Sequence, residues 1–202
     1  MATKRPFPTD PRTRWITVAG EDDRRMELLE PFSFHDEARV WTAPKGHVVD
    51  GASIPRALWA LVGSPFTGRY RRASIVHDWG CDEAVAGRAD RREVDRMFYR
   101  ACRAGGCSPG QAAMLYAGVR IGAWHRLNLP GVVEVEGPRL ELDSYERQVI
   151  EEYRQIAGSL DVRDAPDDAQ AVELAVDRAQ AKYFARLAAA EQAHAVARAT
   201  IR

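Results

Sequence analysis

Residues 69–107 read RYRRASIVHDWGCDEAVAGRADRREVDRMFYRACRAGGC. Apolar residues recur in this stretch at the three- and four-residue spacing of a helix face, first around Ile75 and Trp79 and then around Val94. The spacing predicts two helices joined by a short polar turn, around which the rest of the chain is organised. Asp90, followed three residues later by Glu93, is typical of the start of the second helix.

The same two helices carry the residues that suggest chemistry. His77 and Asp78 are adjacent on the first helix, and Asp95 lies beside apolar residues on the second. A buried carboxylate needs a partner, because removing an unpaired charge from water costs several kcal/mol, and His77 is the expected partner of Asp95. Asp95 would then hold one ring nitrogen while the other nitrogen takes a proton from water. Asp78 faces a loop, where it can hold a hard cation such as calcium.

Composition limits the classes of protein to consider. The chain has 202 residues and 46% hydrophobic content, enough for one ordinary core. Basic and acidic residues both number 29, so no net charge attracts nucleic acid. No apolar run approaches the roughly 20 residues of a membrane span, and the first residues do not resemble a signal peptide. We therefore expect a protein kept in a cytoplasm or packed into a particle assembled there, without a transmembrane segment, whose three cysteines are reduced.

Strand patterns precede the two helices. Residues 1–13 contain three prolines and are predicted to form a flexible arm. Three segments of partly alternating character, separated by polar turns, predict a small antiparallel sheet: Trp15–Ala19, Arg25–Phe34 and Arg39–Val49. The predicted class is α+β, with the sheet packed on a helical core in a domain of residues 14–142.

The segment between the sheet and the helices contains DGASIP at residues 50–55. Asp50 and Gly51 predict a turn, and Ser53 is the expected cap of a short helix over Arg56–Leu61. Asp50 either bonds its own backbone in that turn or reaches the His77 site. Further along, Ser108 predicts the start of a third helix, and VVEVEG (132–137) predicts an edge strand.

From residue 143 onward the composition changes to that of a helical extension. Residues 144–157 are predicted to form one helix, and residues 167–202, rich in alanine and without glycine or proline, another. Apolar positions in the second step by three and four, with one phase shift between Tyr183 and Leu187. This spacing predicts a helix that self-associates, binds a partner or folds back on its own core.

The arrangement of H-D on one helix and D-x-x-F on a second resembles the secreted and parvoviral phospholipase A2 families. The resemblance implies His77 as the base that activates water, Asp78 as a calcium ligand and Asp95 as the residue that orients His77, with Phe98 packed behind. The loop at Gly63 lies where those families have their calcium loop, although it has one glycine where they use several, and their disulfides are absent. The implied activity is calcium-assisted hydrolysis of phospholipid-like esters.

Apolar residues before the first helix, among them Leu61 and Val62, are expected to form a rim at which a lipid could enter. The residues predicted to line this rim or to support the site are Asp50, Ser53, Trp59, Phe66, Trp79 and Phe98.

A longer pattern, covering about residues 32–124, resembles an uncharacterised domain family common in tailed phages and prophages. Its signatures are PxGxxxDGASIPRxLW, AxxxHDW, RRExDxxF and VRxGxW, the last containing Arg120 and Trp124. The resemblance implies a phage or prophage source and a location in the host cytoplasm or the virion. It implies no established activity.

Two functions from different classes are therefore open. One is a phospholipase A2-like hydrolase that uses calcium, and the other is a non-enzymatic virion, tail or assembly component that contacts phage structural proteins or itself through residues 167–202. Weaker alternatives are a zinc site using His47, His77 and His125, and a cysteine nucleophile at Cys81, four residues after His77.

Overall fold

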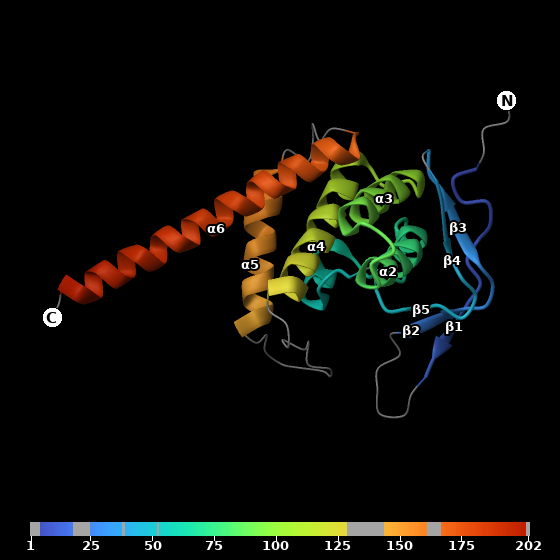
Figure 1. Ribbon diagram of the computed structural model, residues 1–202, viewed down its shortest axis with the longest axis horizontal. Helices are drawn as coiled ribbons and strands as arrows, with labels where there is room; N and C mark the ends of the chain where they lie inside the picture. Colours follow the sequence, from blue (N-terminus) through green and yellow to red (C-terminus); the bar gives the residue numbers. More distant parts are fainter. Residues whose placement is uncertain are drawn as a thin grey trace.

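The computed structural model describes residues 5–17, 25–37, 39–51, 53–128, 144–160 and 167–200, and it confirms the α+β class. Short strands of this part of the chain lie on one side of the molecule and helices occupy the rest (Figure 1). Within the same residues, no helix combines the length and the apolar character needed to cross a membrane.

The strands are shorter than the predicted segments because turn residues divide them. Pro31 separates two strands where one was expected over Arg25–Phe34, and the turn at Pro44–Gly46 divides Arg39–Val49 in the same way. One antiparallel sheet has the order β1-β2-β5, and the other is the pair β3-β4. The strands are β1 (Thr13–Ile16), β2 (Arg25–Leu28), β3 (Phe32–His35), β4 (Val40–Ala43) and β5 (Val48–Val49).

The described part of the predicted arm packs on the strands. The ring of Phe7 is 8% exposed and lies 5.8 Å from the ring of Phe32 and 5.1 Å from that of Phe34. The backbone N–H of His35 donates to the carbonyl of Pro6. Residues 5–12 therefore contribute to the core, because burying the Phe7 ring outweighs the cost of ordering a short segment.

Six α-helices follow in the described residues, preceded by one 3-10 turn. They are η1 (Arg56–Leu58), α1 (Trp59–Val62), α2 (Arg71–Val85), α3 (Arg91–Ala104), α4 (Pro109–Asn128), α5 (Ser144–Ser159) and α6 (Ala169–Thr200). The predicted edge strand at 132–137 and the domain boundary at 143 lie outside the described residues.

The capping predictions have different outcomes. The Asp90 side chain accepts from the N–H groups of Arg92 and Glu93 at the start of α3, as predicted, and Ser108 likewise caps α4. The prediction for Ser53 is wrong: η1 begins after Pro55 with no side-chain cap, and Ser53 has φ 56°. A residue in the left-handed region cannot take the extended conformation of an N-cap.

Helices α2 and α3 approach closely where the site lies. Gly80 of α2 faces Val94 of α3, and a Cβ at Gly80 would lie 2.8 Å from Cγ1 of Val94. A larger residue at position 80 would push the helices apart. This contact places His77, one turn before Gly80, beside Asp95, the residue that follows Val94.

Helix α6 has two different halves. Val172, Val176 and Tyr183 are buried, and the first half packs on α3, α4 and α5. From Ala185 to Ala193 every residue is exposed, and the helix extends away from the core (Figure 1). The alternative of a helix folded back on its core thus describes the first half only.

Candidate functional site

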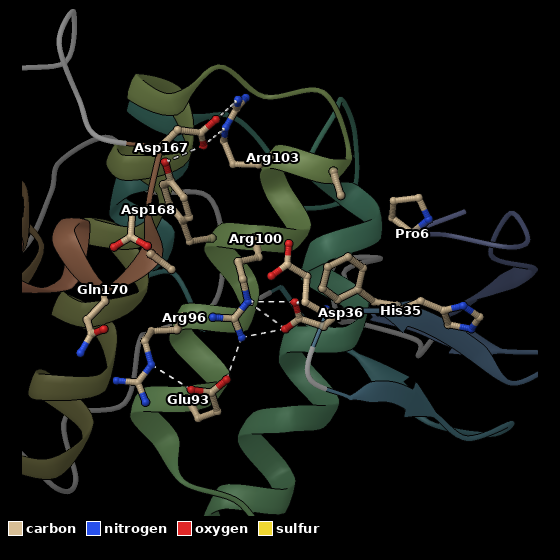
Figure 2. Close-up of a pocket in the computed structure, with 15 residues that line it drawn as sticks. Pro6, His35, Asp36, Glu93, Arg96, Arg100, Arg103, Asp167, Asp168 and Gln170 are labelled. Carbon is tan, nitrogen blue, oxygen red and sulfur yellow. Dashed lines mark hydrogen bonds and ion pairs between the residues drawn. The ribbon is translucent and has the colours of Figure 1, made fainter. Parts of the chain in front are cut away.

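A charged groove of about 720 Å³ lies between β3, α3 and the start of α6 (Figure 2). Its arginines are already paired with carboxylates: Arg100 with Asp36 at 2.7 Å and Arg103 with Asp167 at 2.6 Å. None of the residues predicted to form the site lines this groove. The predicted reacting residues lie instead on α2 and α3: His77 and Asp78 on the first, Asp95 on the second.

His77 and Asp95 form the contact that the sequence predicts. Nε2 of His77 lies 2.9 Å from Oδ1 of Asp95, and both side chains are 0% exposed. The ring of Phe98 lies 4.7 Å from the imidazole. Bonding at Nε2 and packing against Phe98 hold the ring in one orientation, which an acid–base residue requires.

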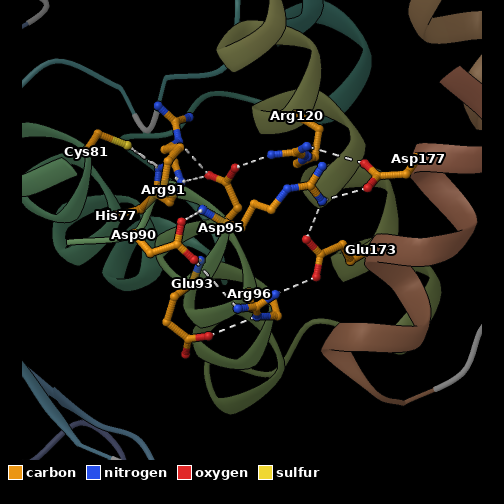
Figure 3. A network of polar contacts seen from close by, with 11 residues as sticks. His77, Cys81, Asp90, Arg91, Glu93, Asp95, Arg96, Arg120, Glu173 and Asp177 are labelled. Carbon is orange, nitrogen blue, oxygen red and sulfur yellow. Dashed lines mark hydrogen bonds and ion pairs between the residues drawn. The ribbon is translucent and has the colours of Figure 1, made fainter. Parts of the chain in front are cut away.

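Asp95 also accepts from two arginines that the site prediction did not include. Nε of Arg91, one turn earlier on α3, lies 2.9 Å from Oδ1, and Nη1 of Arg120 on α4 lies 3.2 Å from Oδ2 (Figure 3). The spacing of Arg91 and Asp95 is a sequence signal for an ion pair on a helix. Arg120 belongs to a quoted signature, but only packing brings it to Asp95.

This network continues into α6. Arg120 contacts Asp177 at 3.3 Å (Figure 3). Arg92 contacts Asp177 at 2.6 Å and Glu173 at 2.7 Å. Arg96 contacts the other oxygen of Glu173 at 2.7 Å. Charged side chains therefore connect α2, α3, α4 and α6 around Asp95.

The surroundings favour an ion pair between His77 and Asp95. Burial opposes the charged imidazole, but the neighbouring Cys81 sulfur and the bond to Asp95 outweigh burial and raise the pKa of His77 to about 9. Burial also opposes the charged carboxylate, but His77, Arg91 and Arg120 lower the pKa of Asp95 to about 2. Both shifts favour the charged forms of this pair, so His77 acts as a base only above its raised pKa.

Cys81 lies against the imidazole ring. Its Sγ is 3.6 Å from Nδ1 and 3.7 Å from Nε2 of His77. Nearly equal distances to both nitrogens mean that the sulfur does not point along the lone pair of Nδ1, as a nucleophile that gives its proton to that nitrogen would. Cys81 therefore contacts the imidazole without the alignment of a nucleophile and its base.

Asp78 has one oxygen in use and one without a partner. Its Oδ2 accepts from the backbone N–H groups of Asp50 and Gly51, both at 2.9 Å. Its Oδ1 is buried and has no hydrogen-bond partner within the described residues. Burial and the charge of Asp50 raise the pKa of Asp78 to about 7. A cation at Oδ1 would give this oxygen a partner and would favour the charged carboxylate. Oδ1 of Asp78 therefore fits a calcium ligand.

Gly63, the other predicted calcium ligand, has φ 94° and already accepts, through its carbonyl, from the hydroxyl of Tyr70 at 2.5 Å. Across the described residues, no group of three or more histidine, cysteine and carboxylate side chains is arranged to hold a metal ion. A calcium ion at Asp78 would therefore take most of its other ligands from backbone carbonyls and water. Calcium binding stays a prediction.

Aromatic side chains, two of them from the predicted rim, form a row that begins beside the loop holding Asp78. A Cβ at Gly51 would lie 2.9 Å from the ring of Trp59, and that ring lies 5.7 Å from the ring of Phe66. Phe66 in turn lies 5.5 Å from the ring of Trp15, which is 51% exposed. Three aromatic rings thus form a continuous row between the loop that holds Asp78 and solvent, with exposed Leu61 on the same segment as Trp59.

Two other predicted residues lie away from the reacting groups. The backbone of Ser53 packs on α4, where a Cβ at Gly122 would come within 2.1 Å of its carbonyl. Trp79 is half-buried against the hydrophobic core. Both positions support packing around the site.

The histidines of the zinc alternative have different partners. Nε2 of His125 lies 2.8 Å from Glu152, between α4 and α5, and Nδ1 of His47 lies 3.8 Å from Asp82. His77 is held by Asp95. The structure does not bring these three histidines together, and the pair of His125 and Glu152 is a buried contact that sequence reasoning missed.

Comparison with known proteins gives relatives without a described activity. Two proteins of Sinorhizobium fredii (strain NBRC 101917 / NGR234) are similar to this chain: the uncharacterized protein y4jT, 39% identical over 92 residues, and the uncharacterized protein y4iH, 34% identical over 105 residues. The matches cover 45% and 52% of this chain but only 26% and 42% of those proteins. No solved structure matches significantly. Residues 26–119, which include His77, Asp78 and Asp95, match the family described as protein of unknown function (DUF1353).

Proposed function

We propose that this protein is a phage- or prophage-encoded hydrolase of lipid-like esters in which His77 activates water. The observation that carries the proposal is the oriented pair of His77 and Asp95 next to Asp78, whose buried Oδ1 has no partner in the described structure. The aromatic row that ends at exposed Trp15 supports an apolar substrate entering beside Asp78.

In the proposed reaction, neutral His77 takes a proton from water at Nδ1 while the water oxygen attacks the ester carbonyl carbon. The proton then passes to the departing alkoxide, so the products are a carboxylic acid and an alcohol. Asp95 keeps Nε2 protonated and stabilises the imidazolium. Asp78, with backbone carbonyls, would hold calcium, whose charge would stabilise the oxyanion.

The test is release of fatty acid from mixed phospholipid vesicles by the purified protein, with calcium and with a chelator. The rate should rise with pH through about 9, because His77 must lose its proton to act. His77→Gln should lower the rate at least about a hundredfold, the usual contribution of a general base. His125→Gln is the matched control, since it changes another buried histidine and should leave the rate within a few-fold.

Folding of each variant is checked by circular dichroism and thermal unfolding. A folded His77→Gln protein with undiminished rate would contradict the proposed role of His77. Absence of fatty acid at every pH, with and without calcium, would favour the second candidate.

The second candidate is a non-enzymatic virion, tail or assembly component. Complete burial of His77 and Asp95, and the three cationic partners of Asp95, favour it, because such a network stabilises helix packing without any reaction. Contacts with phage structural proteins would then fall on the exposed half of α6. In this case His77→Gln lowers stability and no variant hydrolyses lipid.

A further inference from the structure

The second half of α6 extends from the core without a packing surface within the described chain. Residues from Ala185 to Ala193 are all exposed, and the helix continues to Thr200 (Figure 1). Isolated helices of about 15 residues are marginal in water even when rich in alanine. A contact with another molecule would therefore stabilise this half.

The exposed half continues the apolar face that packs on the core. Val176 and Tyr183 are buried on that face, and Leu187, at 39% exposure, comes one turn after Tyr183. At about 100° per residue, later positions of the sequence fall on the same side of the helix. We name these sequence positions the α6 stripe: Leu187, Ala190, His194 and Ala197.

The phase shift in the sequence coincides with the end of the core. Apolar positions alternate between steps of four and three residues up to Tyr183 and again from Leu187. The step from Tyr183 to Leu187 breaks that alternation. Packing on α4 and α5 uses the first series, which leaves the second series free for a different partner.

We propose that the α6 stripe pairs with the α6 stripe of a second copy of this chain in antiparallel orientation. A parallel partner would continue along the same face past Tyr183, where α4 and α5 already lie. In an antiparallel pair, the α6 helix of the second copy ends near Tyr183 of the first copy. The core of the second copy then lies beyond the C-terminal end of the first copy's α6. The contact is the same on both copies, so it closes as a symmetric dimer.

The charges of this segment are complementary in that orientation. By sequence and apart from His194, Glu191 and Arg198 are the acidic and basic residues between positions 187 and 201, three and four residues from the middle of that segment. Antiparallel pairing brings Glu191 of each copy near Arg198 of the other. Parallel pairing in register would bring like charges together.

The first test is the mass of the full-length chain by sedimentation equilibrium over about a hundredfold range of concentration. A concentration-dependent dimer is expected. Leu187→Glu should weaken dimerisation about thirtyfold, because two half-exposed leucines leave the contact. Leu174→Glu is the matched control, since Leu174 is a 51% exposed leucine on the opposite side of α6, and should leave the dimer unchanged.

The second test examines orientation by exchanging charges. Glu191→Arg alone should weaken the dimer several-fold by placing two cations together, and the double variant Glu191→Arg, Arg198→Glu should restore it. A monomeric wild-type chain over the whole range, or a dimer that Leu187→Glu leaves intact, would overturn the proposal. A double variant that stays as weak as the single one would overturn the antiparallel orientation. None of these outcomes depends on hydrolase activity.

Discussion

Two buried histidine–carboxylate pairs occupy neighbouring parts of the helical core. Nε2 of His77 lies 2.9 Å from Asp95, between α2 and α3, and Nε2 of His125 lies 2.8 Å from Glu152, between α4 and α5. No side chain of the four is more than 2% exposed. The geometry of the two contacts is therefore nearly the same.

Their surroundings are different. Asp95 also accepts from two arginines, Arg91 and Arg120, whereas the other oxygen of Glu152 accepts from the neutral amide of Gln180 at 3.0 Å. Asp95 is thus the centre of a charged network, and Glu152 bonds one ring and one amide. Similar pairs can hence have different energetic roles, because the neighbours decide how strongly charge is stabilised.

The largest expected difference comes from removing each carboxylate charge. Asp95→Asn should lower the free energy of unfolding by about 3–5 kcal/mol, because Arg91 and Arg120 lose their shared counter-charge in a mostly buried site. Unfolding in urea measures this change. A loss below about 1 kcal/mol would mean that the network around Asp95 contributes little.

A second difference should be seen in the pH dependence of stability. The pKa of His77 rises from its ordinary 6.5 to about 9 on folding, so the folded protein holds this proton more tightly. The resulting stabilisation, about 3 kcal/mol, is fully present below about pH 6.5 and is lost as pH rises through about 9.

Urea unfolding of wild type and His77→Gln at a series of pH values isolates this contribution. Titration of Asp78 acts in the same direction between its ordinary pKa and about 7, and the charge of His77 lowers the pKa of Asp78, so the two proteins are compared with Asp78→Asn in both. The difference between the two should shrink toward pH 9. A difference that stays constant would show that His77 is uncharged in the folded protein.

A smaller effect is expected at the second pair. Glu152→Gln should lower the free energy of unfolding by about 1 kcal/mol, because one hydrogen bond weakens and no buried arginine is left without a counter-charge. Glu151→Gln, at the exposed neighbouring position, is the control and should have almost no effect. A loss equal to that of Asp95→Asn would remove the distinction between the two pairs.

The smallest effect is expected from the thiol beside His77. Cys81→Ala should lower the free energy of unfolding by about 1 kcal/mol through lost packing, and should lower the pH at which stability declines, because the thiol raises the pKa of His77. Cys102→Ala, at a buried cysteine of α3, is the control for packing alone. Equal pH profiles for the two variants would contradict an effect of Cys81 on the ring.

The features that the sequence predicted correctly depend mostly on residues close together in the chain. Helix α3 and its cap at Asp90 were predictable because their hydrogen bonds join residues close in sequence. The long strand over Arg25–Phe34 was not correct, because Pro31 outweighed the alternating pattern. Pairing of His77 with Asp95 was predictable because a buried carboxylate needs a partner and His77 was the candidate on the adjacent helix.

By itself, the sequence determined that residues 71–104 contain two helices, that Asp90 caps the second, and that the apolar spacing of α6 changes after Tyr183. Only the tertiary structure decided that Arg120 reaches Asp95 from 25 residues away, that His125 meets Glu152, and that half of α6 is covered. The physical reason is that periodicity and caps depend on neighbours within a few residues, whereas these contacts depend on how the helices pack.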